Sequence, residues 1–595
     1  MPAKRTTRQT LLAGAAGSDG SPQPEPRLVD PAMGDSASES ALAKLNAAIA
    51  GLRAASVAPL LQDAVAAIRA GDAQRASELA LKALQADERN GHGWHVLAIA
   101  REQTGDYRSS ISAYEAALAL LPEHDDVAND LGRLAFRMGM TELAVRLFAV
   151  YRDAHPEDPQ GANNLACALR DLHDYQGAIA VLKPAIEAAP DVALLWNTLA
   201  TVLIASGDTR TAMPFLEEAV RLEPDFAKAR YTRANARLEF GDVGGALADI
   251  EAAMANAELP SDLAMMTFAR AQMLLVGGRV GEGWDAYEAR FAPQFSGRTS
   301  FVIERPRWSP DDDLAGRSLL LIGEQGLGDE VMFANALPDV LAALGAAGRL
   351  SLALEPRLIP LFRRSFPGVP IVEHATYRVD GHSIRTVPEV DEGGIDVWAP
   401  LAAPLRRFRR SVEAFPAHDG YLAPDPARIA HWRAVLAALP GRKVGILWKS
   451  LKLDGSRLRE FSPFERWRGV LATPGVTFVN LQYGECDAEI AEARARFGVD
   501  IARLPGINLK DDLDELAALC VALDLVLGPA NATSNIAGAC GAPVWLISTP
   551  VAWPKLGTDR YPWYPATRVF SAEAFGQWDG VMGRIADALA AWAPV

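Results

Sequence analysis

Small side chains recur along the first half of the chain with a period of 34 residues. Gly-Asp pairs stand at 71–72, 105–106, 207–208 and 241–242, and Gly139-Met140 and His173-Asp174 fill the two places between them. Five residues after each of these positions comes a small residue, in the order Ala76, Ser110, Ala144, Ala178, Ala212 and Ala246. A repeat of this length with small contact residues predicts helical hairpins that stack side by side.

The spacing resembles that of the tetratricopeptide repeat (TPR) family. One hairpin cannot bury its apolar face alone, so we expect the units to form a right-handed solenoid with a concave surface. Six units fit between roughly 57 and 260, and a degenerate seventh follows at 274–291 with Gly283 in the small-residue place. The expected solenoid domain is 41–292.

A second regularity falls on the first helix of each hairpin, on the face that lines the groove. The fifth position of successive units is His95, Asn129, Asn163, Asn197 and Tyr231. An amide offers both a donor and an acceptor, so the three asparagines can pair with the backbone of an extended polypeptide whatever its sequence. We expect them to bind a protein acceptor. The alternative is that they are solvated or bind the neighbouring hairpin.

After about Arg305 the repeat ends, and short apolar runs alternate with helical stretches. Runs at 317–324, 348–355 and 394–401 form one block, and runs at 443–450, 476–484, 523–531 and 542–548 form a second, closed by a helix near 573–592. Such alternation predicts parallel sheets with right-handed crossovers. The expected fold is therefore an all-α TPR solenoid followed by an α/β module of two Rossmann-like lobes, 293–400 and 441–595, joined by a connection at 401–440.

Composition excludes several classes of function. A formal charge of −15 argues against wrapping nucleic acid or lying on anionic lipid. The four cysteines match neither a disulfide framework nor a CxxC pattern, which suits a reducing compartment. His92 and His95 are spaced as a metal pair could be, but no third ligand is near in sequence, so no metal site is expected.

No apolar run approaches the ~20 residues that span a bilayer. The N-terminus begins with basic residues, as a signal peptide does, but its apolar centre at Leu11–Gly17 is short. The following stretch is rich in Pro, Ser, Gly and Asp, a composition typical of disorder. We expect a cytoplasmic protein with a disordered leader at 1–40.

In open parallel sheets the ligand binds beyond the carboxyl ends of the strands. The first loop there is GEQGLGD at 323–329, whose glycines allow close approach to the backbone, although such a loop alone often only forms a tight turn. The loop after 443–450 carries Lys449, Arg457 and Arg459, which could meet a phosphate or carboxylate or could form a solvated face.

Two further loops complete the candidate site. Gln482 follows the next apolar run. The loop after 523–531 brings small polar residues to the start of a helix: Asn531, Thr533, Ser534 and Asn535. A helix N-terminus with free N–H groups and hydroxyls can receive an anion. The alternative is a plain helix cap with close helix–sheet packing.

Several stretches together resemble bacterial TPR proteins that carry a heptosyltransferase-like (glycosyltransferase family 9) module: GEGWDAYEAR, LIGEQGLGDEVMFANALP, VGILWKS, NLQYGE, NIAGACGAPVWLIS and RYPWYPATRVF. Among such proteins the chain looks most like the transferases that attach a nonulosonic acid, such as pseudaminic acid, to flagellin. The resemblance extends from about 57 almost to the C-terminus. It implies a two-lobed GT-B fold, a nucleotide-activated sugar as substrate, and no metal or other cofactor.

The resemblance also suggests a role for Asp329. In the family the aspartate after the glycine-rich loop is the proposed general base, which takes the proton of the acceptor hydroxyl in an inverting transfer. Gly326 and Gly328 would let the acceptor and the donor sugar approach this loop. Alternatively, Asp329 would only favour the N-terminus of its own helix.

One departure from the family pattern concerns the donor. Where the family has an Asp-Thr pair and a later histidine at the donor phosphate, this chain has Ala530-Asn531 and Asn535. The change disfavours ADP-heptose and favours a donor such as a CMP-sugar, which has a single phosphate. We expect a protein O-glycosyltransferase that captures a protein acceptor, flagellin first, and modifies its Ser or Thr. The alternative is a non-catalytic TPR adaptor or chaperone with a degenerate module.

Overall fold

The computed structural model describes residues 56–593 except 123, 380–381, 419 and 451–458. The expected leader at 1–40 and the candidate Arg457 therefore lie outside the described residues. The chain divides into two compact units, Met1–Leu203 and Ile204–Val595, and each is considered by itself.

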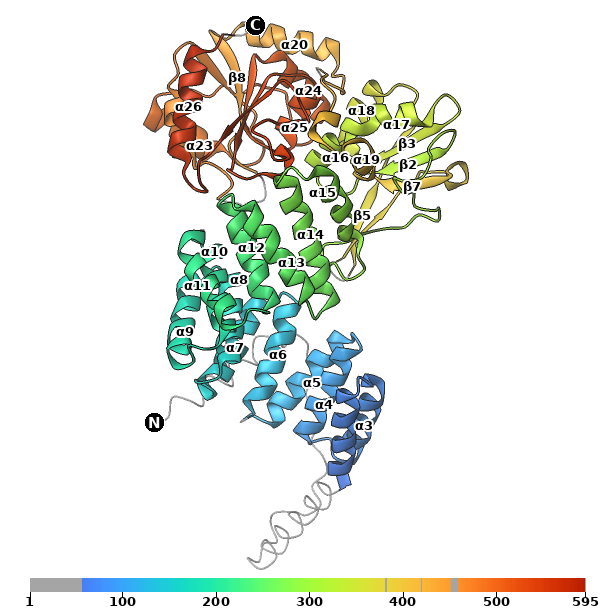
Figure 1. The fold of residues 1–595 in the computed structure, drawn as a ribbon, viewed down its shortest axis with the longest axis vertical. Coiled ribbons are helices and arrows are strands. Elements are labelled where there is room, and N and C mark those ends of the chain that lie inside the picture. The colour runs from blue at the N-terminus through green and yellow to red at the C-terminus, as the bar shows by residue number, and fades with distance from the viewer. Residues whose placement is uncertain (1–55, 123, 380–381, 419, 451–458, 594–595) are drawn as a thin grey trace, which may run out of the picture. The chain divides into compact units, whose positions relative to one another are not determined.

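The first unit consists of helical hairpins (Figure 1). Residues 56–69 are helical. The helices that follow are α3 (Ala73–Ala86), α4 (Gly91–Gln103), α5 (Tyr107–Leu120), α6 (Asp125–Arg137), α7 (Thr141–Ala154), α8 (Pro159–Asp171) and α9 (Tyr175–Ala188), and α10 (Ala193–Ala205) reaches the border of the unit.

The recurring Gly-Asp pair makes the turn inside each hairpin. Its glycine adopts a positive φ, between 75° and 92° in the five repeats that have one, a region that glycine enters without steric cost. The aspartate then caps the second helix. Asp72 Oδ1, for example, accepts a hydrogen bond of 3.0 Å from Arg75 N. The small residue five places after the glycine is fully buried in every repeat, so the two helices can pack closely.

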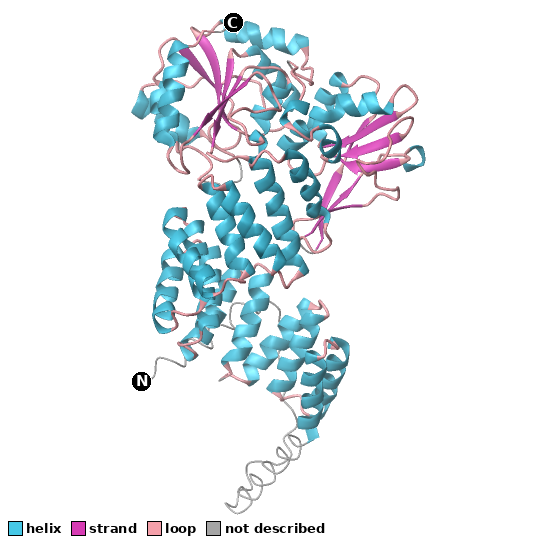
Figure 2. Ribbon diagram, in the orientation of Figure 1, coloured by secondary structure: helices cyan, strands magenta, loops and turns pink. Residues whose placement is uncertain are grey.

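The second unit begins with the last hairpins: α11 (Thr209–Leu222), α12 (Ala227–Glu239), α13 (Val243–Ala255), α14 (Pro260–Val276) and α15 (Val280–Tyr287). Two lobes follow, and the strands of Figure 2 belong to them. The first lobe has a parallel sheet in the order β4-β3-β2-β7, made of β2 (Ser318–Ile322), β3 (Arg349–Leu354), β4 (Ile371–Glu373) and β7 (Val397–Pro400). Its helices include α16 (Leu327–Phe333), α17 (Leu337–Leu344), α18 (Ile359–Ser365) and α19 (Ala403–Phe408).

The second lobe has a parallel sheet in the order β12-β11-β10-β8-β9. Its strands are β8 (Arg442–Ile446), β9 (Val476–Asn480), β10 (Leu525–Pro529), β11 (Val544–Ser548) and β12 (Thr567–Ser571). Its helices include α20 (Pro426–Ala437), α22 (Arg468–Leu471), α23 (Asp487–Glu492), α24 (Leu513–Ala522), α25 (Ala532–Ala539) and α26 (Trp578–Ala591).

The expected fold class, TPR helices followed by an α/β region with parallel sheets, is confirmed. The sequence patterns missed a small third sheet in the order β1-β6-β5, made of β1 (Thr299–Phe301), β5 (Ala375–Val379) and β6 (His382–Thr386). Four of the five residues of β5 are exposed, so this strand lacks the apolar run by which the others were recognised.

Aromatic packing joins the last repeats to the lobes. Trp284 of α15 is buried and lies edge-on to Trp553 and Trp563, with ring centroids 6.1 and 6.3 Å away. Its Nε1 donates a hydrogen bond of 2.9 Å to the carbonyl of Arg409. Gly557 lies so close to the end of α14 that a Cβ there would be 2.6 Å from Gly278 Cα. The last repeats and the lobes therefore share a core.

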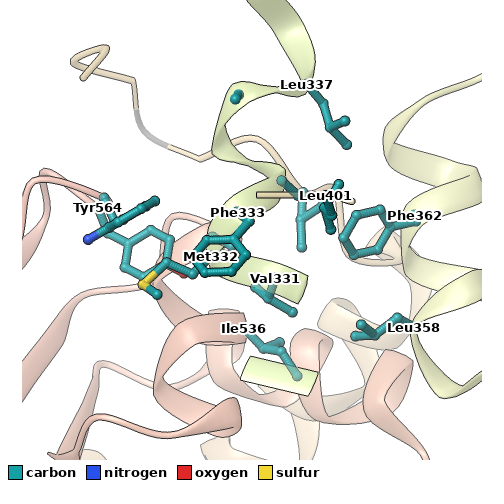
Figure 3. Packing of buried hydrophobic residues seen from close by; sticks show 14 of the residues in the cluster. Val331, Met332, Phe333, Leu337, Leu358, Phe362, Leu401, Ile536 and Tyr564 are labelled. Atoms are coloured by element: carbon teal, nitrogen blue, oxygen red, sulfur yellow. The ribbon is translucent and has the colours of Figure 1, made fainter. Parts of the chain in front are cut away.

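The two lobes also pack directly on each other. Figure 3 shows Val331, Met332 and Phe333 of α16 between residues of the first lobe and residues of the second, among them Ile536 and Tyr564. Arg364 of α18 forms a bidentate ion pair with the buried Asp514 of α24, with N–O distances of 2.7 and 2.8 Å. This packing fixes the carboxyl ends of the two large sheets relative to each other.

We predict that Trp284→Ala lowers the free energy of unfolding of the second unit by about 3–5 kcal/mol, because it empties a buried indole site at the centre of this core. Urea denaturation followed by circular dichroism measures the change. Leu263→Ala on α14, whose side chain is exposed, is the control and should alter stability by less than about 0.5 kcal/mol. Equal effects of the two changes would contradict the assignment of Trp284 as a core residue.

Candidate active site

The glycine-rich loop leaves the carboxyl end of β2 and leads into α16. Packing requires a glycine at the first of these positions, Gly323, because a Cβ there would overlap the carboxylate of Glu330. Residue 323 must therefore lack a side chain for Glu330 to be buried one turn into α16. The glycine faces a residue of its own chain here.

Glu330 is the centre of a buried polar cluster under the loop. Its carboxylate pairs with His374 Nε2 at 2.9 Å and accepts a hydrogen bond of 2.9 Å from Glu355 N. Arg385 donates to the carbonyl of Gly323 and lies 3.9 Å from the Glu330 carboxylate. Burial lowers the pKa of Arg385, against the opposing charges of Glu330, Glu324 and Glu355.

The next residue of the loop, Glu324, forms an ion pair with a residue at the end of the last repeat. Arg290 donates from Nε and Nη2 to the two oxygens of Glu324, at 2.7 and 3.2 Å, and both side chains are buried. Ala402 N donates to the same carboxylate at 2.8 Å. Gln325 donates to the hydroxyl of Tyr287. These contacts fix the position of the loop before the chain reaches Asp329.

Asp329 lies in the first turn of α16 and is half-buried. Its Oδ2 accepts a hydrogen bond of 3.2 Å from Gly326 N, so it helps to cap the helix, as the structural alternative expected. Burial raises the pKa of Tyr561, and the nearby charge of Asp329 adds to this shift. Burial also raises the pKa of Tyr287, and the charges of Glu324 and Asp329 add to this shift.

The structure brings the glycine loop of the first lobe against α25 of the second lobe. Asn535 Nδ2 donates a hydrogen bond of 3.1 Å to the carbonyl of Gly328. A Cβ at Gly328 would lie 3.1 Å from this Nδ2 and 3.3 Å from Ala532 N. A side chain at residue 328 would press on the start of α25, so the third glycine of the loop favours this close contact. Candidate residues that are two hundred positions apart meet here.

The polar residues at the start of α25 form a reciprocal cap. Asn531 Oδ1 accepts from Ser534 N at 3.2 Å, and Ser534 Oγ accepts from Asn531 N at 2.8 Å. Thr533, Ser534 and Asn535 are buried. Asn531 Nδ2 is buried and has no hydrogen-bond partner among the described residues, which leaves the two N–H groups of this amide for an acceptor.

The two described basic residues after β8, Lys449 and Arg459, have different partners. Lys449 pairs with Glu489 of α23. Arg459 pairs with Glu239, the last residue of α12, and donates to Thr209 Oγ1 at 3.1 Å. Neither described side chain forms the solvated face that was the alternative, and each has a specific acidic partner. Arg457 cannot be placed with them, because it lies outside the described residues.

Gln482 is buried and all its hydrogen-bonding capacity is used by backbone. Its Oε1 accepts from Trp448 N and Lys449 N at 2.9 and 3.0 Å, and its Nε2 donates to the carbonyls of Lys449 and Tyr483. Gln482 therefore fixes the backbone where the chain leaves β8. Beside it, at the carboxyl end of β9, lies a cavity of about 390 Å³ lined by polar residues that include Asn480, Tyr483, Asn508 and Lys510.

In the first unit, the asparagines of the groove face bond to neighbouring hairpins. Asn164 Nδ2 donates to Asn129 Oδ1 at 3.2 Å, and Thr198 Oγ1 donates to Asn163 Oδ1 at 2.6 Å. Asn197 is only 8% exposed. Contact with the neighbouring hairpin was the alternative stated above, so binding of an acceptor by these amides stays a prediction.

Sequence reasoning missed the buried support of the site: Arg290, Glu324, Glu330, His374 and Arg385. One signal was present, because Trp284 and Arg290 both belong to the GEGWDAYEAR stretch. The others are charged residues that become buried only through partners far away in sequence.

Comparison with known proteins identifies the family. The chain matches the tetratricopeptide repeat family at residues 102–166, 163–227 and 197–262. It is 54% identical over 566 residues to protein FlbA of Caulobacter vibrioides, an alignment that covers 95% of each chain. The chain belongs to the FlbA family. Identity at this level along nearly the whole length includes both the repeats and the lobes.

Two solved structures are similar to part of this FlbA-family protein. A tetratricopeptide repeat protein from Parabacteroides merdae is 17% identical and covers 39% of this chain and 93% of its own, with a TM-score of 0.35. PilW, titled a type IV pilus biogenesis factor, is 19% identical and covers 35% of this chain and 97% of its own, with a TM-score of 0.31.

The described part of the chain has neither a membrane-spanning helix nor a cluster of metal ligands. No described helix is long and apolar enough to cross a membrane. No group of three or more His, Cys, Asp or Glu side chains among the described residues is placed to hold a metal ion.

We predict that Gly323→Ala destabilises the protein by about 1–3 kcal/mol, because the new methyl group must displace the buried Glu330 carboxylate from its partners. Gly326→Ala is the matched control in the same loop. Its Cβ would meet only Asp329 Oδ2, at 3.4 Å, so stability should change by less than about 0.5 kcal/mol. Thermal melting of both variants decides the matter, and a stable Gly323→Ala protein would contradict the packing argument.

Proposed function

We propose that this FlbA-family protein is a metal-independent, inverting O-glycosyltransferase. It transfers a sugar from a nucleotide-activated donor to Ser or Thr of a protein acceptor, with flagellin as the first candidate, in the cytoplasm. The observation that carries the proposal is the meeting of Asp329 and its glycine loop with the start of α25 across the two lobes, joined by the 3.1 Å hydrogen bond from Asn535 to Gly328.

The chemistry assigned to Asp329 follows from its surroundings. An inverting transfer needs one carboxylate to accept the proton of the acceptor hydroxyl while the new bond forms. Asp329 is half-buried at the carboxyl edge of the first sheet, where ligands of parallel sheets bind. The ion pair of Arg290 with Glu324 and the cap from Gly326 N hold it in place. A fixed carboxylate that still reaches the surface suits a general base.

The donor is assigned to the second lobe. Asn531 Nδ2, which has no partner among the described residues, and the first N–H groups of α25 can donate to a phosphate. Arg503 and Lys510 supply positive charge at the cavity at the end of β9. Ala530-Asn531 stands where the resembled family has an Asp-Thr pair at the donor phosphate, which disfavours ADP-heptose. We therefore favour a CMP-nonulosonic acid, such as CMP-pseudaminic acid, over ADP-heptose.

The solenoid supplies acceptor capture in this proposal. TPR repeats imply protein binding, and Asn129, Asn163 and Asn197 remain the proposed contacts, through the parts of their amides not used between hairpins. Since each net hydrogen bond contributes only about 0.5–1.5 kcal/mol, capture needs several repeats at once.

A second candidate function, a non-catalytic adaptor, is favoured by one observation. The side chains of Gln482, Ser534 and Asn535 are bonded within the protein, and Lys449 and Arg459 have acidic partners. An adaptor would bind the protein acceptor but neither bind nucleotide nor transfer sugar. Intact mass spectrometry of flagellin from cells with and without the gene separates the two functions, because only the transferase changes the acceptor mass.

We predict that Asp329→Asn lowers the transfer rate by about 10²–10⁴ while fold and acceptor capture persist. Asparagine keeps an oxygen that can accept from Gly326 N, so the cap survives and only the base is lost. The measurement is transfer to purified acceptor, with melting temperature and pull-down as checks on structure. The control is Asp339→Asn on α17, which loses an ion pair with Arg409 but no proposed base. Transfer by Asp329→Asn within a few-fold of the unaltered protein would remove the base role.

A further inference from the structure

Lys555 is a half-buried lysine at the carboxyl edge of the second large sheet. It ends a single turn of helix, Trp553–Lys555, in the loop that follows β11. Its Nζ donates to the hydroxyl of Ser571, the last residue of β12, and to the carbonyl of Pro550, at 3.0 Å each. Ser571 is paired with Ser548, the last residue of β11. The ammonium group therefore lies where two neighbouring strands end, on the edge at which parallel sheets bind ligands.

The charge of Lys555 has no acidic partner in the part of the chain that the structure describes. Two neutral oxygens receive two of its three N–H groups, so one N–H remains. Burial lowers the pKa of Lys555, and the charge of Asp559 opposes this shift only in part. By contrast, Arg503 at the end of β9 pairs with Asp487. A partly buried cation with an unused donor is favourable for binding an anion.

The turn that carries Lys555 is held by the last repeats. The next residue, Leu556, is buried and has a left-handed backbone with a φ of 51°. Such a conformation costs a leucine about 1–3 kcal/mol, and it persists only where the surroundings fix it, most often at binding and catalytic sites. Here the following Gly557 packs directly on Gly278 at the end of α14. This packing maintains the strained turn, and the turn keeps the lysine at the edge of the sheet.

The ammonium group lies close to the phosphate site that the proposed function places at the start of α25. That helix follows β10, which is the neighbour of β11 in the sheet. Adjacent strands are about 4.8 Å apart, so Lys555 Nζ lies one to two strand spacings, about 5–10 Å, from the carboxyl end of β10. Two anionic groups on one carbon atom fit such a separation when each accepts a hydrogen bond of about 2.8 Å from its own side. In a CMP-nonulosonic acid the anomeric carbon carries both the phosphate ester and a carboxylate, whereas a neutral sugar such as heptose has no carboxylate.

We propose that Lys555 binds the carboxylate of an acidic donor sugar, while the start of α25 binds the phosphate. The inference rests on the proposed function and deepens it, because it assigns the group that distinguishes a nonulosonic acid from a neutral sugar. The remaining N–H of Lys555 donates to a carboxylate oxygen, and the ligand supplies the opposite charge that the described residues do not.

The test is isothermal titration calorimetry of the full chain with three probes: CMP, CMP-N-acetylneuraminic acid as a CMP-nonulosonic acid, and the methyl ester of that compound. The ester keeps the nucleotide and the sugar but removes the charge of the carboxylate. The unaltered protein should bind the acid about tenfold more tightly than the ester, because the ester loses a charge-assisted hydrogen bond. In Lys555→Gln this preference should disappear, while the affinity for CMP stays within about twofold.

Two further variants separate the charge from the packing of the side chain. Lys555→Arg keeps the charge and should keep part of the preference for the acid. The matched control is Lys443→Gln, which removes a half-buried lysine at the amino end of β8, on the opposite edge of the same sheet. It should leave all three affinities unchanged. The comparison of acid and ester in the unaltered protein needs no variant, so it decides the matter even if Lys555→Gln folds poorly.

Equal affinity of the unaltered protein for acid and ester would overturn the inference, and so would a preference for the acid that survives in Lys555→Gln. Equal losses of affinity for CMP and for the CMP-sugar in Lys555→Gln would assign Lys555 to the phosphate and would also overturn it. Absence of transfer to flagellin with the preference intact would contradict the transferase and leave the carboxylate site.

If the unaltered protein binds none of the three probes, the donor assignment fails, and free N-acetylneuraminic acid still tests Lys555. At high concentration it should slow the acetylation of Lys555 by acetic anhydride, as measured by mass spectrometry, and its methyl ester should not. Equal rates of acetylation with the acid and the ester would then overturn the inference.

Discussion

The guanidinium of Arg290 lies against the carboxylate of Glu324 with almost no access to solvent. Removal of one partner from a buried pair costs about 3–5 kcal/mol, because the remaining charge has no water to replace it. Arg290 comes from the short helix that ends the repeats, and Glu324 is the second residue after β2. The pair therefore determines where the glycine loop begins, and with it the position of Asp329. Gln325 and Tyr287 make the same connection one residue later.

The need to compensate a buried charge also explains the polar cluster under the glycine-rich loop. A buried carboxylate needs hydrogen bonds or an opposite charge, and Glu330 obtains them from His374, from Glu355 N and from the nearby Arg385. Space for this carboxylate exists only because residue 323 is a glycine. The glycines of the loop thus have two structural partners, Glu330 below and the start of α25 on the opposite lobe. Close approach of a ligand would be a further reason for glycine in this loop, in addition to these two packing contacts.

The sequence predicted those features whose signals are local. The repeats are visible because the turn glycine, the capping aspartate and the small residue all lie within one hairpin. Seven strands of the two large sheets are visible because burial makes them continuous apolar runs. The edge strands β4 and β12 were not predicted, because only part of each is buried. The strand β5 was missed because most of its residues are exposed, so it forms no continuous apolar run. The buried cluster of Arg385, His374 and Glu330 was not predicted, because these residues come together only in the folded chain.

Candidate residues could be named from sequence, but their partners could not. Asp329, Gly328 and Asn535 were expected at one site and do lie together. Arg459 was expected either at a ligand or in solvent, and its observed partner, Glu239, lies more than two hundred residues earlier in the chain. Periodicity and spacing describe one segment at a time. A contact between repeat and lobe depends on how the last repeats pack, which the aromatic cluster around Trp284 determines.

This packing has a consequence for ligand binding. Lys449 already has an acidic partner, and the amides of Gln482 and Asn535 already have carbonyl partners. A phosphate at Lys449 would therefore exchange one charge-assisted hydrogen bond for another, and such an exchange gains much less than the first formation of the bond. If the protein is the transferase proposed above, the nucleotide alone would contribute little affinity. Most of the binding energy would come from groups that have no partner among the described residues, such as Asn531 Nδ2, and from the sugar and the captured acceptor. Tight binding would then require donor and acceptor together, which would limit hydrolysis of the donor when no acceptor is present.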